Sequence, residues 1–312
     1  MLLSAHLLLP DTAMAQEGYY KDLFIDGGHD LTSRTELYAG NYLGLTYDAL
    51  ATDDEDLQYE TMISSSDDTN GALLYPDGAP RYRVIYTAGG SSTGHGRSLG
   101  EEGRDRVRDF FYGGGSYTGS CAGAFLSMIH RTIDEYDEGG PWENYYHLWP
   151  GIGRPSYVLD AYHDIFFDDT THPLVAMYPS LQDGWVSTVR HNGGCRFDPN
   201  YFENPVETEY IGIMDSPSLS GLDGYYNMMA YKESAETGRV VVTCSHPEGV
   251  TDGEQRDMMA AILQYALDGQ GTPWAPKGTL ENGSSQLIID DAALLGDYQY
   301  HYWKVDFPQY VQ

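Results

Sequence analysis

Basic residues are scarce in this chain of 312 residues. Lys and Arg number 17 against 47 Asp and Glu, so the formal net charge is −30. Lysine occurs at only four positions, namely Lys21, Lys232, Lys277 and Lys304. Such a polyanion is repelled by phosphate backbones and anionic lipids, so we expect neither nucleic acid nor membrane as a partner. A hydrated acidic surface favours a halophilic or marine source, and the alternative is an acidic protein at low salt.

Long hydrophobic runs are absent as well. The apolar run 2–9 is far too short to span a bilayer, and no other stretch is a better candidate. Ala13, Met14 and Ala15 precede Gln16 in the small-x-small pattern of a signal-peptide cleavage site, although a charged start is missing. We therefore predict a signal-peptide-like segment at 1–16 and export to the periplasm or the exterior. The alternatives are an apolar strand or a disordered start in a cytoplasmic protein.

Cysteine is rare, with only Cys121, Cys195 and Cys244 present. An odd count in an exported protein leaves at least one thiol free or intermolecular. We expect three reduced thiols. The alternative is a Cys195–Cys244 disulfide that leaves Cys121 free.

Apolar strands and helical stretches alternate along most of the chain. The expected strands are 21–25, 83–87, 116–119 and 239–243, and the expected helices are 35–49, 101–111, 122–129 and 252–267. This alternation predicts an α/β fold with a mostly parallel sheet and helices on both faces. The Gly-, Pro- and Tyr-rich segment 134–236 is interpreted as strands and loops of the same domain. The domain is expected to span 17–268, with an extension at 269–312 that either packs back on it or is dispensable.

One glycine-flanked cysteine stands out at the end of a predicted strand. Gly119-Ser120-Cys121-Ala122-Gly123 has the form of a nucleophile elbow, a sharp turn that holds its central residue in a strained conformation before a helix. Glycine on each side removes Cβ atoms that would collide. Unpaired amides at the following helix N-terminus would favour a thiolate. The alternative is a small buried cysteine in a glycine-rich turn.

A nucleophile of this kind needs amide donors for a developing oxyanion. The backbone N–H of Ala122 is one candidate. Gly90, with Gly89 next, supplies the other from the turn that follows strand 83–87. The alternative is an ordinary strand-to-loop turn.

A histidine and a carboxylate follow the last apolar strand. In Ser245-His246-Pro247-Glu248-Gly249 the two side chains lie two positions apart in an extended segment and so point to the same side. Imidazole titrates in the range that suits a base for a thiol, and it needs an acceptor to orient it. A solvated or capping histidine is the alternative, but the carboxyl edge of an α/β sheet is where ligands bind.

The segments GGGSYTGSCAGAFL (113–126) and SHPEG (245–249) together resemble the class I glutamine amidotransferase-like superfamily, most closely its biotin-protein ligase N-terminal-type domain. The resemblance covers about residues 20–268. It implies a flavodoxin-like sheet with a nucleophile elbow at its carboxyl edge. It also implies Cys121 as nucleophile, His246 as base and Glu248 as the partner that orients the imidazole.

Several regions that a transferase of this superfamily needs are not found in the sequence. The sequence contains no ligase catalytic region, synthetase domain or ATP-binding motif. We therefore expect a cysteine-dependent hydrolase of a small-molecule or peptide-like amide, such as glutamine or a γ-glutamyl bond. Two alternatives stay open: a non-catalytic binding or scaffold module, and an ammonia-supplying subunit that would require a partner synthetase.

The remaining polar clusters carry weaker signals. Arg97 is a candidate for binding a substrate carboxylate, and a solvated loop arginine is its alternative. A dense His/Asp cluster is interpreted as a solvated acidic loop rather than a metal site; its members are His163, Asp164, Asp168, Asp169 and His172. His147 and His191 are interpreted as structural or surface residues. We predict no metal and no cofactor.

Overall fold

The computed structural model describes residues 19–32, 37–63, 70–75, 78–131, 142–200, 204–269 and 287–290. The predicted signal-peptide-like segment at 1–16 lies outside these residues and stays a prediction. None of the helices in the described ranges is long and apolar enough to cross a membrane.

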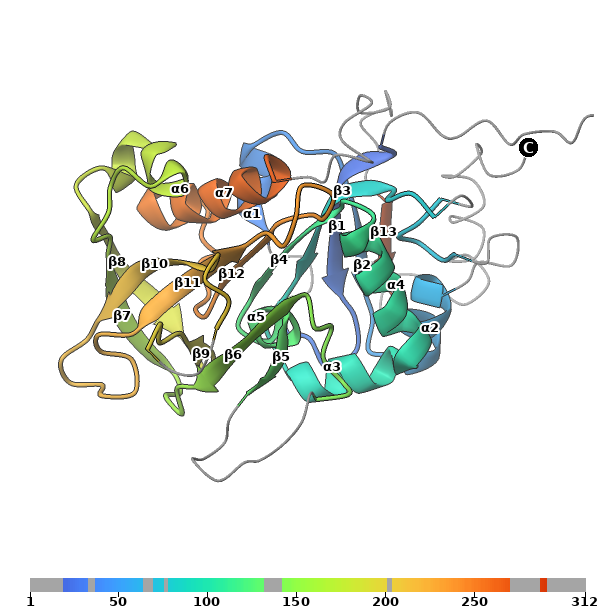
Figure 1. The fold of residues 1–312 in the computed structure, drawn as a ribbon, viewed down its shortest axis with the longest axis horizontal. Coiled ribbons are helices and arrows are strands. Elements are labelled where there is room, and N and C mark those ends of the chain that lie inside the picture. The colour runs from blue at the N-terminus through green and yellow to red at the C-terminus, as the bar shows by residue number, and fades with distance from the viewer. Residues whose placement is uncertain are drawn as a thin grey trace, which may run out of the picture.

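A mixed sheet of ten strands forms the centre of the described structure, in the order β13-β2-β1-β3-β4-β12-β11-β10-β7-β8 (Figure 1). Its parallel half comprises β1 (Lys21–Gly27), β2 (Tyr47–Ala51), β3 (Tyr82–Thr87), β4 (Ser116–Ser120), β12 (Val240–Thr243) and β13 (Leu287–Asp290). Its antiparallel half comprises β7 (Ala161–Phe166), β8 (Trp185–His191), β10 (Glu209–Asp215) and β11 (Tyr226–Tyr231). A smaller sheet joins β5 (Met128–Arg131), β6 (Trp149–Pro155) and β9 (Cys195–Arg196).

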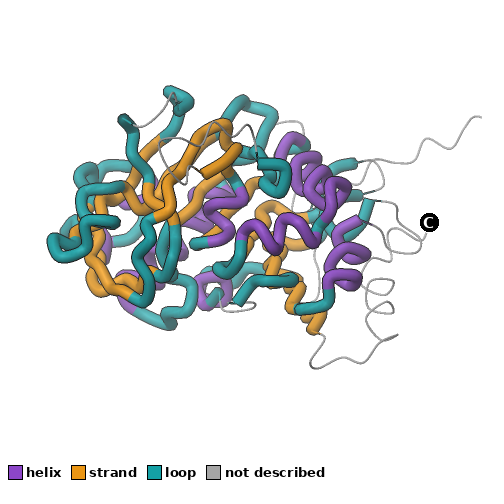
Figure 2. The backbone as a smooth tube through the Cα atoms, turned by 90° about the horizontal axis from the view of Figure 1, so that it is seen from below, coloured by secondary structure: helices purple, strands orange, loops and turns teal. Residues whose placement is uncertain are grey.

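Helices lie on both faces of the large sheet (Figures 1 and 2). One face carries α1 (Tyr38–Tyr42), α6 (Pro173–Ala176), the short 3₁₀ helix η1 (Pro179–Leu181) and α7 (Gly253–Leu267). The other carries α2 (Glu55–Ile63), α3 (Ser92–Ser98), α4 (Gly100–Tyr112) and α5 (Ala122–Leu126). Strand β12 shows how the sheet divides the core: Val240 and Val242 join one apolar cluster, and Val241 joins the other.

Most predicted elements of the parallel half are present. The strands at 21–25, 83–87, 116–119 and 239–243 and the helices at 101–111 and 252–267 are confirmed to within a few residues. The helix predicted over 35–49 is wrong. In its described part, α1 ends at Tyr42, Gly44 has φ of 69°, and the chain turns into β2 at Tyr47. A glycine in the left-handed region terminates a helix readily, which explains the early end.

The large sheet is parallel over six of its strands, as predicted, but it continues into an antiparallel half that was not expected. The segment between β5 and β12 supplies β7, β8, β10 and β11, and these strands pair antiparallel with one another and with β12. The connections between β10 and β11 and between β11 and β12 are short, so each of these strands returns antiparallel beside the one before it. The C-terminal strand β13 pairs with β2 in parallel, so this described piece of the 269–312 segment packs on the domain.

The parallel half places three chain turns at one edge. The order β2-β1-β3-β4-β12 is the flavodoxin-like order, in which ligands bind beyond the carboxyl ends of the strands. The residues that leave β3, β4 and β12 at this edge include Gly89, Cys121 and His246. The fold thus brings together the three segments that the sequence singled out.

Candidate functional site

Cys121 occupies a strained turn between β4 and α5, with φ of 49° and ψ of −101°. A side chain on either flanking glycine would prevent this turn. A Cβ at Gly119 would lie 2.7 Å from the carbonyl carbon of Gly123, and one on Gly123 would overlap the Thr87 carbonyl oxygen. The Cys121 N–H donates to the Thr243 carbonyl at 3.0 Å, which ties the turn to the end of β12. Such conformations persist only where the surroundings fix them.

The helix after Cys121 is shorter than expected. It ends at Leu126, and β5 follows at Met128, whereas we had expected helix as far as Ile129. A single turn adds little macrodipole, so the helix contributes less to thiolate stability than the sequence suggested. Cys121 is buried, and its thiol donates to the Asn192 carbonyl oxygen at 3.6 Å.

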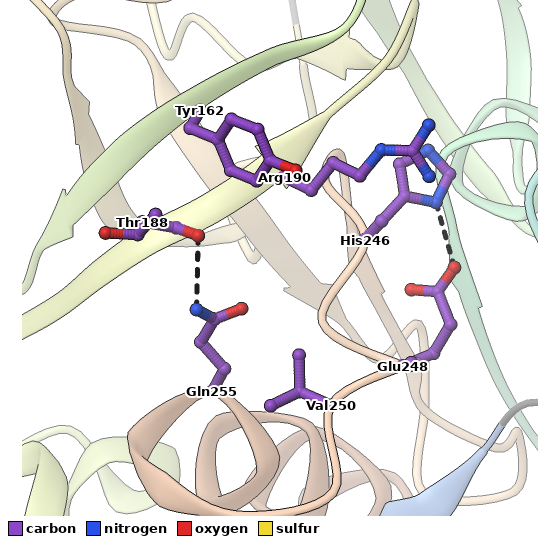
Figure 3. A pocket seen from close by; sticks show the side chains of 8 residues that line it. Tyr162, Thr188, Arg190, His246, Glu248, Val250 and Gln255 are labelled. Atoms are coloured by element: carbon purple, nitrogen blue, oxygen red, sulfur yellow. Dashed lines mark hydrogen bonds and ion pairs between the residues drawn. The ribbon is translucent and has the colours of Figure 1, made fainter.

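His246 and Glu248 form a buried pair at the end of β12 (Figure 3). The Nδ1 of His246 lies 2.8 Å from Oε1 of Glu248, and Glu248 is only 2% exposed. Within the described ranges, His246 Nε2 and Glu248 Oε2 are buried without a hydrogen-bond partner. Because the carboxylate fixes Nδ1 as the donor, Nε2 is the nitrogen that can take a proton from a neighbour.

The imidazole and the thiol meet beside Gly89. A Cβ added to Gly89 would lie 2.5 Å from Cε1 of His246 and 3.4 Å from Cβ of Cys121. Burial lowers the pKa of His246, but its interactions with Cys121 and Glu248 outweigh burial and raise the pKa to about 10. The raised pKa means that the imidazole of His246 binds a proton tightly, so a proton taken from a neighbouring group is well held on Nε2.

The two predicted amide donors follow residues of the site in the sequence. Gly90 follows Gly89 in the turn after β3, and Ala122 follows Cys121. In the part of the chain that the structure describes, no backbone carbonyl or side chain accepts a hydrogen bond from the N–H of Gly90 or of Ala122. Arg97 lies on α3 with an exposed side chain, and its role in substrate binding stays a prediction.

The pairing of the cysteines differs from the prediction. Cys195 and Cys244 form a disulfide, and Cys121 is the free thiol. The expectation of three reduced thiols is therefore wrong, because β9 returns across the end of β12. The disulfide joins the segment that carries Asn192 to the segment that carries His246.

The sequence analysis missed a chain of buried hydrogen bonds centred on Ser245. The Ser245 hydroxyl lies 2.8 Å from His163 Nε2, 3.1 Å from His191 Nδ1 and 2.6 Å from Asn227 Nδ2. His163 Nδ1 must donate to the Asp164 carbonyl, so its Nε2 accepts from Ser245, and His191 Nδ1 donates to Ser245. This assignment holds for neutral imidazoles, the form that their lowered pKa values favour, and these hydrogen bonds fix the residue before His246.

Burial agrees with that assignment. Burial lowers the pKa of His163. Burial, and then the repulsion that His163 and His246 would exert when protonated, lower the pKa of His191 to about 3. The interpretation of 163–172 as a solvated acidic loop therefore fails for His163, which is buried on β7. It holds for Asp169, whose carboxylate caps the exposed turn at Thr171. The only sequence feature that pointed to these hydrogen bonds was the position of Ser245 directly before the histidine of SHPEG.

Comparison with known proteins gives low similarity throughout. No protein-family model and no curated protein matches this chain. Among solved structures, a ThuA-like protein from Bacteroides uniformis aligns at 13% identity over 83% of this chain and 97% of its own, with a TM-score of 0.49. PurLQS from Thermotoga maritima aligns at 14% identity over 78% and 99%, with a TM-score of 0.46. The glutaminase domain of Trypanosoma brucei CTPS, solved with acivicin, aligns at 12% identity over 78% and 89%, with a TM-score of 0.43.

Proposed function

We propose that this protein hydrolyses an amide through Cys121, His246 and Glu248. The supporting observation is the buried His246–Glu248 pair, whose free Nε2 lies beside a cysteine held at positive φ. Unpartnered buried nitrogen atoms are costly, and they are retained where a reaction uses them.

The chemistry follows from the positions of these groups. The Cys121 thiol turns from the Asn192 carbonyl and gives its proton to His246 Nε2, while Glu248 stabilises the imidazolium. The thiolate attacks the amide carbon, and the amine leaves with the proton from Nε2. Water then cleaves the thioester, which releases the acid and restores the thiol.

The tetrahedral intermediate needs two hydrogen-bond donors on its oxygen. The N–H groups of Gly90 and Ala122 are proposed for this role, because neither donates to another described group. Ala122 follows Cys121 directly, and Gly90 follows Gly89, which lies against Cys121 Cβ. Gly89 is proposed to let the substrate approach, since any side chain there would strike His246.

A non-catalytic binding module is the second candidate. It is favoured by the contact of the thiol with Asn192, because a thiol bound to a carbonyl oxygen is not poised for attack. An ammonia-supplying subunit, the closer resemblance to a biotin-protein ligase N-terminal-type domain, and export from the cytoplasm remain finer proposals. Each of the three rests on the sequence alone.

Alkylation of Cys121 distinguishes a catalytic site from a non-catalytic binding module. Labelling by iodoacetamide is followed against pH in high salt and located by peptide mass spectrometry, for wild type, His246→Ala and a control, His147→Ala. An activated thiol labels fast near neutral pH in the wild type and the control, and slowly in His246→Ala. Labelling of the wild type no faster than that of a cysteine peptide contradicts the proposal.

A further inference from the structure

An open pocket is lined in part by His246 and Glu248 (Figure 3). Its volume is about 380 Å³, within the range of small-molecule sites. The residues that line it are Tyr162, Thr188, Arg190, His246, Glu248, Gly249, Val250 and Gln255. Cys121 is not among them, so an occupant would contact the imidazole rather than the sulfur.

The wall of the pocket contains a strained residue. Thr188, in β8, has φ of 57°, a conformation that is rare for a β-branched side chain. Its N–H donates to Asp164 Oδ1 at 2.8 Å, and its carbonyl accepts from Gln255 Nε2 at 3.1 Å. Two neighbouring elements thus hold Thr188 in this conformation. Strain fixed in this way concentrates at ligand sites.

Arg190 supplies a positive charge to this pocket in a strongly acidic chain. Its carbonyl accepts from the His246 N–H at 2.9 Å, so the arginine is adjacent to the imidazole, and Figure 3 shows its side chain extending toward that ring. The guanidinium pairs with Asp160 at 3.2 Å, but Asp160 is 82% exposed. Exposed pairs contribute little, so a ligand carboxylate can replace Asp160 readily.

We propose that this pocket binds the amine half of the substrate, and that this half carries a carboxylate recognised by Arg190. The proposal rests on the proposed function. His246 must protonate the leaving nitrogen, so that nitrogen lies against the imidazole, where the pocket begins. Ammonia would leave the pocket almost empty. The substrate is therefore a secondary amide of an amino acid or peptide, and the products are the free acid and the released amino acid or peptide.

Two matched alkylating reagents test the charge preference without knowledge of the natural substrate. Chloroacetyl-glycine carries a carboxylate beyond its amide, and chloroacetyl-glycinamide lacks it. We expect the first to label Cys121 roughly five- to tenfold faster in wild type, as a charge-assisted Arg–carboxylate contact would give. In Arg190→Met the ratio should fall to one or below, since the net charge repels the anion. Arg190→Lys should keep part of the preference.

Arg106→Met is the matched control, because Arg106 also forms an ion pair with an exposed aspartate, Asp109 at 3.6 Å, but on α4. Its ratio should equal that of wild type. A wild-type ratio near one, or a preference that survives in Arg190→Met, overturns the assignment of the pocket. Absence of Cys121 labelling by both reagents contradicts the proposed function itself, and this inference with it.

Discussion

Two buried histidine–carboxylate pairs lie at the carboxyl edge of the sheet, and they differ in one respect. In the pair His95–Asp26, Nε2 lies 2.9 Å from Asp26 Oδ2 and Nδ1 lies 2.9 Å from the His29 carbonyl. Both nitrogens are used. In the pair His246–Glu248, Nδ1 is used and Nε2 is buried without a partner in the described structure. We call His95–Asp26 the closed pair, because both ring nitrogens are bonded, and His246–Glu248 the open pair, because one ring nitrogen is not. A closed pair stabilises the fold, whereas an open pair has a nitrogen that can take part in a reaction.

The charges of the two pairs follow from the same contacts. Burial lowers the pKa of His95, but the charge and hydrogen bond of Asp26 outweigh it, so the pKa is raised. Since carbonyl and carboxylate oxygens only accept, both ring nitrogens of His95 carry protons and the ring is an imidazolium. His95 therefore has no capacity to act as a base, although it resembles His246 in burial and partner.

The largest effect is expected at the thiol beside the open pair. Cys121→Ala should lower amide hydrolysis by about 10⁴-fold or more, because the covalent intermediate forms on the Cys121 sulfur. Circular dichroism and the urea midpoint should stay near those of wild type, since the thiol donates only one weak bond. Hydrolysis that survives the substitution would remove Cys121 from the mechanism.

Glu248→Gln tests the open pair from its carboxylate side. Gln can still accept from Nδ1 but cannot stabilise an imidazolium, so we expect hydrolysis and Cys121 alkylation at neutral pH to fall by about 10²–10⁴-fold. Rates measured across pH report the change, because the His246 pKa, raised to about 10 in wild type partly by Glu248, should fall. An unchanged pH profile would show that Glu248 does not act on the imidazole.

Asp26→Asn should have the opposite pattern to Glu248→Gln. Breaking a buried ion pair costs about 3–5 kcal/mol of stability, while Cys121 alkylation should stay near wild type. Because the pKa of His95 is higher in the folded than in the unfolded protein, the pair contributes its full stability below the unfolded pKa of ~6.5. This contribution is lost as pH rises through the pKa of His95 in the folded protein. Urea unfolding at several pH values, wild type against variant, measures both. Equal loss of alkylation in Asp26→Asn and Glu248→Gln would contradict the distinction between the pairs.

A smaller effect concerns His191, which is buried and neutral. Its pKa is lowered to about 3, so the unfolded chain takes up the proton first as pH falls below ~6.5. Its contribution to stability is present above pH 6.5 and is lost toward pH 3, by a few kcal/mol at most. The unfolding free energy of His191→Gln should therefore vary less between pH 7 and pH 4 than that of wild type. Equal slopes would mean that His191 does not remain neutral in the folded protein.

The candidate site shows which features of the protein are local in sequence. Gly119, Gly123 and the Cys121 between them define a turn within a few residues, and His246 and Glu248 lie two positions apart. Steric exclusion by Cβ atoms and the alternation of an extended chain act at this range, so the sequence analysis found these residues. The Ser245 chain was missed because it depends on contacts with His163, 82 positions away.

The same reasoning explains the errors in the fold. The antiparallel half of the sheet lies in a segment of weak periodicity, where pairing partners rather than residue pattern fix the strands. The disulfide was not expected because an odd count of cysteines says nothing about which of them become neighbours. Gly44 was visible in the sequence, but its role in ending α1 at Tyr42 became clear only from its positive φ.

The sequence by itself determined the parallel strands β1, β3, β4 and β12, the strained cysteine turn and the histidine–glutamate pair, because each depends on short-range sterics or on a continuous apolar run. Only the tertiary structure decided that β4 and β12 are neighbours, that Asn192 covers the thiol, that Cys195 meets Cys244 and that Arg190 and Thr188 form a pocket beside His246. These features join residues tens of positions apart. Their proximity follows from the packing of the whole sheet, which no local pattern encodes.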